Sequence, residues 1–141
     1  MQHTEPAPAP ITLKRLDHLV LTVADVEKTV AFYTKVLGMK DVMFHGTRHA
    51  LVFGGQKINL HEKGHEWEPK AEKPTPGSAD LCFVTDDTIE NVEKRLKALN
   101  VPIETGPVQR TGALGPILSV YIRDPDQNLI EISHYLASIM N

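Results

Sequence analysis

The chain has few of the features that mark several common classes of protein. Its 141 residues include a single cysteine, Cys82, which excludes an internal disulfide. No apolar run is long enough to span a bilayer, and the first ten residues lack the apolar core of a signal peptide. The net charge of −3 provides no basic surface for nucleic acid. We therefore expect a cytoplasmic protein that binds neither nucleic acid nor a membrane.

The composition that remains is typical of a globular domain, with 41% hydrophobic and 23% charged residues. The opening MQHTEPAPAP alternates Pro and Ala, which favours extended conformations, so we predict a disordered tail over residues 1–12. A single domain follows at 13–141. Residues 63–77 are polar and rich in Pro and Gly, which indicates a linker between module one (13–62) and module two (78–135).

The first half begins with a strand over residues 16–23, whose side chains alternate between two faces. Asp25 is an expected N-cap for a helix running to about Leu37, where apolar residues recur at helical spacing and Gly38 supplies the stop. We predict three short strands after it, at 41–44, 49–53 and 57–61.

The second half repeats this order. We predict a strand at 79–85, a helix at 88–99, and strands at 101–104, 118–123 and 128–134, with a long loop at 106–116 of a kind that is often functional. Two β-α-β-β-β units indicate an α+β fold of two paired modules related by a pseudo-two-fold axis.

The repeat aligns four chemically similar residues. His18 matches Asp80 at the start of each module, and His61 matches Glu131 in the last strands. Two imidazoles and two carboxylates suit Mn²⁺, Fe²⁺, Co²⁺, Ni²⁺ or Zn²⁺. A metal would also explain a carboxylate in the apolar strand of Glu131. The competing interpretations are a half-exposed His18 and an Asp80 that only forms a salt bridge or caps a turn.

Three further residues are candidates for substrate contact. Lys57 and Asn59 share a strand face with His61, and Arg110 lies among Gly and Thr in the long loop. Arg110 suits a substrate carboxylate or phosphate, and an exposed solubilising Arg is the alternative.

Several stretches resemble the vicinal-oxygen-chelate superfamily, which includes glyoxalase I, extradiol dioxygenases and bleomycin resistance proteins. The signals are LDHLVLTVADVEKTVAFYTKVLGM and YIRDPDQNLIEISHY; FGGQKINLHEKG and PTPGSADLCFVT are similar to the glyoxalase-domain-containing protein 5 group. The resemblance implies an open eight-stranded barrel-like sheet around one divalent metal ion (Ni, Co, Zn, Mn or Fe). It implies His18, His61, Asp80 and Glu131 as ligands. Two positions depart from the family pattern. The third ligand is usually His and is Asp80 here; the second is Glu or Gln in glyoxalase I and is His61 here.

The function that the resemblance implies is a metal-dependent, glyoxalase-like lyase or isomerase acting on a small oxygen-chelating substrate. Glu131 is the expected catalytic base, with Asp80 second. The alternatives are an extradiol-type dioxygenase and a non-catalytic, ligand-binding resistance protein. The resemblance also implies a homodimer. It leaves open the metal, any need for glutathione, and whether modules pair within one chain or between two.

Overall fold

The computed structural model of the chain describes residues 6–136, which form two successive β-α-β-β-β units. The elements of module one are β1 (His18–Val23), α1 (Val26–Lys35), β2 (Lys40–Phe44), β3 (Arg48–Phe53) and β4 (Gln56–Glu62). Those of module two are β5 (Asp80–Val84), α2 (Ile89–Ala98), β6 (Thr105–Thr111), β7 (Pro116–Arg123) and β8 (Leu129–Tyr135).

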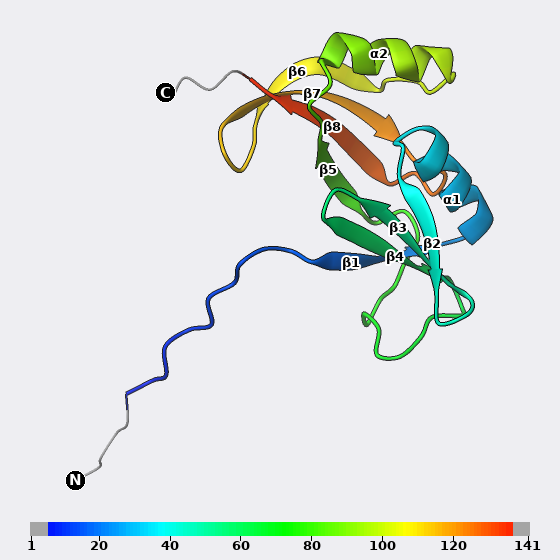
Figure 1. Ribbon diagram of the computed structural model, residues 1–141, viewed down its shortest axis with the longest axis vertical. Coiled ribbons are helices and arrows are strands. Elements are labelled where there is room, and N and C mark those ends of the chain that lie inside the picture. The colour runs from blue at the N-terminus through cyan, green and yellow to red at the C-terminus, as the bar shows by residue number, and fades with distance from the viewer. Residues whose placement is uncertain (1–5, 137–141) are drawn as a thin grey trace.

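Each module contributes one four-stranded sheet (Figure 1). The strand orders are β1-β4-β3-β2 and β5-β8-β7-β6, so the first and last strands of each module lie side by side and parallel. The other neighbouring strands are antiparallel. This arrangement confirms the predicted α+β class and the paired modules. The eight strands form two separate sheets and no closed barrel among the described residues.

The helices begin where the sequence places capping side chains. Asp25 accepts a hydrogen bond from the Lys28 backbone N–H at 3.0 Å, and Thr88 accepts one from the Asn91 N–H at 3.1 Å. Both bonds satisfy an N–H that the first helical turn leaves free. Gly38, with φ of +67°, follows α1 in a conformation that favours glycine.

On the strands that carry the candidate residues, successive side chains point alternately toward the core and toward the opposite face of the sheet. Ile130 and Ile132 of β8 point into the core, while Glu131 points to the opposite face. Residues of both modules contribute to one hydrophobic core. The opposite face of each sheet is free to carry chemistry.

Beside the shared core, hydrogen bonds and an aromatic contact join the modules. The buried Tyr33 hydroxyl of α1 donates a hydrogen bond of 2.7 Å to Asp124, just after β7. The rings of Phe53 and Phe83 meet edge to face, with centroids 5.3 Å apart. In addition, the Asp126 carboxylate accepts a hydrogen bond from the backbone N–H that follows β1, at 3.3 Å.

Two sequence-based predictions are wrong in module two. The predicted strand at 101–104 is irregular, and strand β6 (Thr105–Thr111) instead covers the first half of the loop predicted at 106–116. β6 is an edge strand that pairs only with β7, so it tolerates a glycine, a proline and a bulge. Val101 and Ile103 pack against the core from an irregular segment, which explains their apolar character.

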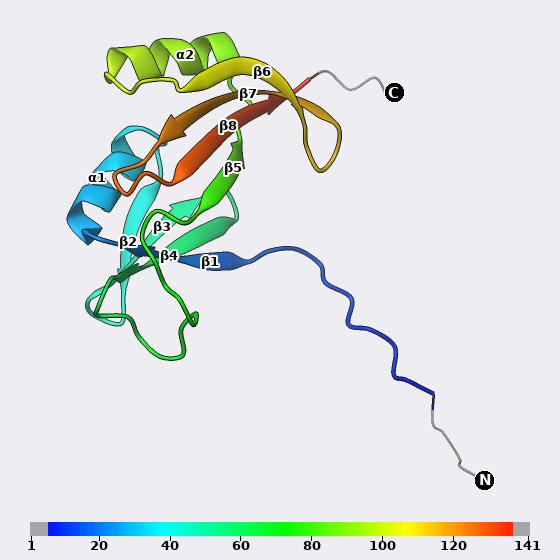
Figure 2. The ribbon, with the colours of Figure 1, turned by 180° about the vertical axis from the view of Figure 1, so that it is seen from behind.

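The predicted disordered tail lies partly outside the described residues, which begin at position 6. Residues 6–17 contain no helix or strand, are exposed, and extend away from the modules (Figures 1 and 2). Across positions 6–136, no helix is both long and apolar enough to cross a membrane.

Candidate functional site

The open face of the first sheet carries the first group of candidate residues. Parallel pairing places His18 opposite Lys57 and Val20 opposite Asn59, so these four side chains are neighbours on β1 and β4. His61 lies further along, opposite Thr22. The strand period of two puts all of these residues on one face.

The pairing of β5 with β8 in module two corrects the sequence-based alignment of the two modules. Asp80 pairs with Leu129, and Cys82 pairs with Glu131. Because His18 and Asp80 are equivalent, the counterpart of Glu131 is Asn59. The sequence-based equivalence of His61 and Glu131 is wrong by two residues, a slip that keeps the strand face and changes the place along the strand.

Asn59 has an unusual environment. Its Oδ1 is the one buried side-chain nitrogen or oxygen without a hydrogen-bond partner within the part of the chain that the structure describes. A buried amide oxygen without a partner lowers stability, by about 1–3 kcal/mol as a general magnitude. This side chain therefore lacks an electropositive partner such as a hydrogen-bond donor or a metal ion.

His18 is oriented by its neighbour in sequence. Its Nδ1 lies 2.8 Å from an Asp17 carboxylate oxygen, which leaves Nε2 free on a side chain that is 42% exposed. The hydrogen bond to His18 holds the pKa of Asp17 below its usual value. A carboxylate on one imidazole nitrogen is the usual companion of metal ligation by the other.

Glu131 is held by two serines that the sequence-based analysis did not single out. Ser119 donates a hydrogen bond of 2.7 Å to Oε2 of Glu131, and the Ser119 and Ser133 hydroxyls lie 2.7 Å apart. Both serines are fully buried. The signal for them was available: each is a small polar residue in an apolar strand, on the same face as Glu131.

Two neighbours complete this end of the second sheet. The Cys82 sulfur lies 3.2 Å from the Ser133 hydroxyl, and burial raises the pKa of the thiol, with the Glu131 charge adding to the effect. Cys82 is thus held in its neutral form. Asp80 is exposed at the first position of β5.

His61 is held by contacts with the linker. Its ring meets Trp67 edge to face at 5.2 Å, and the Arg48 guanidinium lies 4.4 Å from the centre of the Trp67 ring. Only 8% of His61 is exposed. Burial lowers its pKa, and the Arg48 charge contributes in the same direction. A structural role accounts for these contacts.

The candidate substrate residues line the two open faces. Arg110 shares a hollow of about 400 Å³ with Glu131 and Tyr121, and its Nε donates to the Tyr121 hydroxyl at 3.1 Å. On the first sheet, the Lys57 ammonium lies 4.7 Å from the centre of the Phe44 ring.

The structure separates the donor residues into two groups. His18 and Asn59 are neighbours in module one, and Asp80 and Glu131 share a face in module two. Within residues 6–136 there is no group of three or more His, Cys, Asp or Glu side chains that could hold a metal ion. The hollow beside Glu131 is lined by module two alone.

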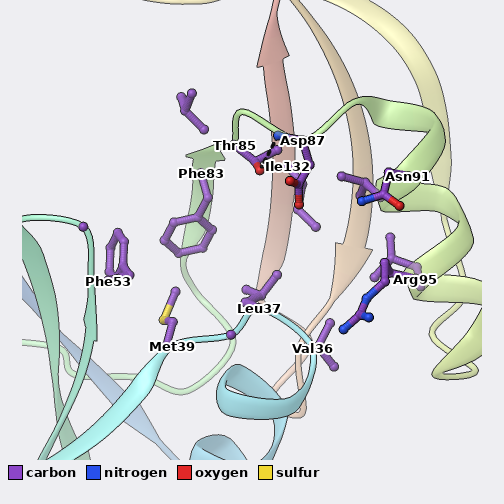
Figure 3. A pocket seen from close by; sticks show the side chains of 15 residues that line it. Val36, Leu37, Met39, Phe53, Phe83, Thr85, Asp87, Asn91, Arg95 and Ile132 are labelled. Carbon is purple, nitrogen blue, oxygen red and sulfur yellow. Dashed lines mark hydrogen bonds between the residues drawn. The ribbon is translucent and has the colours of Figure 1, made fainter.

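A different hollow opens where the modules meet (Figure 3). It has a volume of about 620 Å³ and contains none of these four residues. It is therefore separate from the donor residues on the open sheet faces.

These features define a class: a protein of paired βαβββ modules that present candidate metal ligands on their open sheet faces. The chain belongs to the Glyoxalase/Bleomycin resistance protein/Dioxygenase superfamily, whose family model matches residues 15–132.

Three relatives mark its place there. Virulence protein STM3117 of Salmonella typhimurium is 56% identical over 124 residues, covering 88% of this chain and 86% of that protein. A crystal structure of that protein gives a TM-score of 0.88, covering 89% of this chain and 100% of the other. Glyoxalase domain-containing protein RDO1 of Mycosarcoma maydis is 57% identical over 125 residues, covering 89% of this chain and 70% of that protein. Lactoylglutathione lyase of Salmonella typhimurium is 29% identical over 126 residues, covering 84% and 90%.

Proposed function

We propose that the protein is a divalent-metal-dependent lyase or isomerase of the glyoxalase type, acting on a small substrate with two neighbouring oxygens. The observation that carries the proposal is the pairing of donors at equivalent positions: His18 with Asp80, and Asn59 with Glu131. The similarity to lactoylglutathione lyase supports the same class of reaction.

The proposed ligands come from two copies of the chain. Module one of one protomer supplies His18 and Asn59, and module two of its partner supplies Asp80 and Glu131. Apolar side chains on both open faces favour this association, since Val20 is 47% exposed and Val84 is 60% exposed. The homodimer that the family resemblance implies would cover both.

One imidazole nitrogen and three oxygens form a harder donor set than the two nitrogens and two oxygens first expected. Such a set favours Mn²⁺ or Fe²⁺ over Zn²⁺. It also disfavours extradiol-type oxygenation, because a single imidazole does not provide the two-His, one-carboxylate set of iron oxygenases.

The chemistry of the site divides between the ion and the side chains. A bound divalent ion supplies Lewis acidity, which stabilises negative charge on the substrate oxygens. Ser119 holds Oε2 of Glu131 in place, and the Glu131 carboxylate is the proposed group that takes and returns a proton; Asp80 is the second candidate. Arg110 orients an anionic group of the substrate, and Lys57 lines the facing wall.

Metal content of purified, untagged protein tests the ligand set. We expect about one ion per chain, retained in His61→Ala and lost in Glu131→Gln and in Asn59→Leu, a change that keeps the shape and removes the amide oxygen. Loss of metal in His61→Ala with retention in Asn59→Leu would refute the register argument. An absence of metal uptake by the unaltered protein would refute the metal site.

An activity assay tests the reaction class separately. Metal-loaded protein is expected to isomerise the hemithioacetal of methylglyoxal and a thiol, and to lose this activity in Glu131→Gln. A protein that binds metal and shows no turnover with any thiol would contradict the lyase proposal and favour a ligand-binding protein.

A further inference from the structure

The hollow between the modules has the size of a small-molecule site. Its volume of about 620 Å³ falls within the usual range for such pockets, roughly 300–1,000 Å³. One wall is the segment after α1 together with the β3–β4 turn, and the other comprises the end of β5 and one side of α2 (Figure 3). The candidate metal ligands lie elsewhere, so this hollow needs a separate explanation.

The inner surface of the hollow is apolar. Met39, Leu96 and Ile132 are buried members of the core that reach it. Phe53 and Phe83, stacked edge to face at 5.3 Å, line it where the modules meet. Figure 3 shows both rings beside the open space. Such a surface accepts an aromatic ring or a short aliphatic chain.

In the part of the chain that the structure describes, the rim carries one cation, Arg95, without a hydrogen-bond or ion-pair partner. Arg95 extends from α2 toward Val36 (Figure 3), and Asn91 precedes it by one helical turn. Among the described residues, no hydrogen bond or ion pair involves the Arg95 guanidinium or the Asn91 side-chain amide. Both are therefore free to bind a ligand group.

The rim also carries an acidic residue, Asp87, which precedes α2. It lies before the N-cap residue Thr88, whereas Arg95 lies in the last turn of α2, about 9 Å of helix rise beyond Ile89, the first residue of the helix. An anionic group at Arg95 is thus well separated from the Asp87 charge, and the two ends of the rim differ in sign.

We propose that this hollow is a second ligand site, which binds an amphipathic monoanion: one aromatic ring or short aliphatic chain bearing a carboxylate. The apolar body lies against Phe53 and Phe83, and the carboxylate binds the Arg95 guanidinium, with Asn91 as a hydrogen-bond donor. Because both modules form its walls, the bound ligand holds them in their present arrangement. The proposal is independent of the metal site.

Calorimetric titration of the 141-residue chain, stripped of metal, tests the site, since removing metal prevents carboxylates from binding to an ion instead. The probes are 4-phenylbutyrate and its neutral analogue 4-phenylbutanol. We expect 4-phenylbutyrate to bind about tenfold more tightly, a difference that Arg95→Gln abolishes. Lys97→Gln removes the same charge from α2 outside the hollow and is expected to leave binding unchanged.

A second variant tests the location. Asn91→Trp places an indole in the hollow from an exposed helical position, and its backbone N–H still reaches the Thr88 cap. We expect it to abolish binding of 4-phenylbutyrate, and we expect amide chemical-shift changes in the unaltered protein at Phe83 and Arg95. The proposal is overturned if the protein binds the acid and the alcohol with equal affinity, or if binding survives Asn91→Trp. It is also overturned if the chemical-shift changes centre on Glu131, or if nothing binds at 10 mM ligand, which corresponds to about 2.7 kcal/mol of binding free energy.

Discussion

The buried contact between Tyr33 and Asp124 gives a quantitative prediction about how the modules are held together. Tyr33→Phe keeps the ring, including its edge contact with Phe32 at 5.3 Å, and removes only the hydroxyl that donates at 2.7 Å to Asp124. Asp124 is 3% exposed, so water does not readily replace that donor.

The magnitude follows from what remains around the carboxylate. Asp124 keeps three other donors: the side-chain amide of Asn128 at 2.8 Å, and the backbone N–H groups of Asn128 and Asp126, each at 2.9 Å. A hydrogen bond to a charged group is worth about 1.5–3 kcal/mol, and the remaining donors keep the loss to about 2 kcal/mol. This corresponds to a fall in Tm of about 6 °C for a domain of this size.

Urea denaturation at fixed protein concentration measures the loss, with Tyr135→Phe as the matched control. The Tyr135 hydroxyl accepts a hydrogen bond from the exposed Leu114 N–H at 3.0 Å, so its removal is expected to cost no more than about 0.5 kcal/mol. Equal stability of Tyr33→Phe and the unaltered protein would refute the view that this contact holds the modules together.

The same residue determines a pH dependence. Burial, reinforced by the Asp124 charge, raises the pKa of Tyr33 far above its ordinary value of about 10. Above pH 10 the unfolded chain therefore releases a proton that the folded chain retains, and stability falls by up to about 1.4 kcal/mol per pH unit. Titrating the stability of both proteins from pH 9 to 11 is expected to give a shallower fall for Tyr33→Phe, and parallel curves would contradict the assignment.

Three further predictions concern single residues. Gly106→Ala puts a Cβ 2.5 Å from the Ser119 carbonyl oxygen, at a residue with φ of +107°, whereas the Cβ of Gly54→Ala meets nothing within 4 Å. In urea denaturation we expect the free energy of unfolding to fall by more than about 2 kcal/mol for Gly106→Ala and by about 1 kcal/mol for Gly54→Ala. Equal losses would contradict the steric argument. Asp25→Ala removes the α1 cap and is expected to cost about 1 kcal/mol by the same assay. Ser119→Ala frees Oε2 of Glu131; under the proposed function, metal affinity measured by competition with a chelator falls 10- to 100-fold, and unchanged affinity would exclude a positioning role.

The elements that the sequence predicted well are those with strong local signals. The cap at Asp25, the helical spacing of apolar residues in α1, and the alternation in β1 determine structure within a few neighbouring residues. β6 was missed because an edge strand has one ladder of hydrogen bonds and little burial. Its sequence, with Gly106 and Pro107, has the composition of a loop.

The candidate site was predictable by face and not by position. Every second side chain of a strand lies on the same face, so the alternation pattern alone cannot distinguish Asn59 from His61. What separates them is the partner across the sheet: β1 places Val20 beside Asn59 and Thr22 beside His61. That register is a long-range property, fixed by how β1, β4 and α1 pack together. The choice changes the chemistry, because an amide oxygen in place of an imidazole nitrogen narrows the five ions left open by the sequence toward manganese or iron. The identity of a bound metal would therefore report on the strand register of the site.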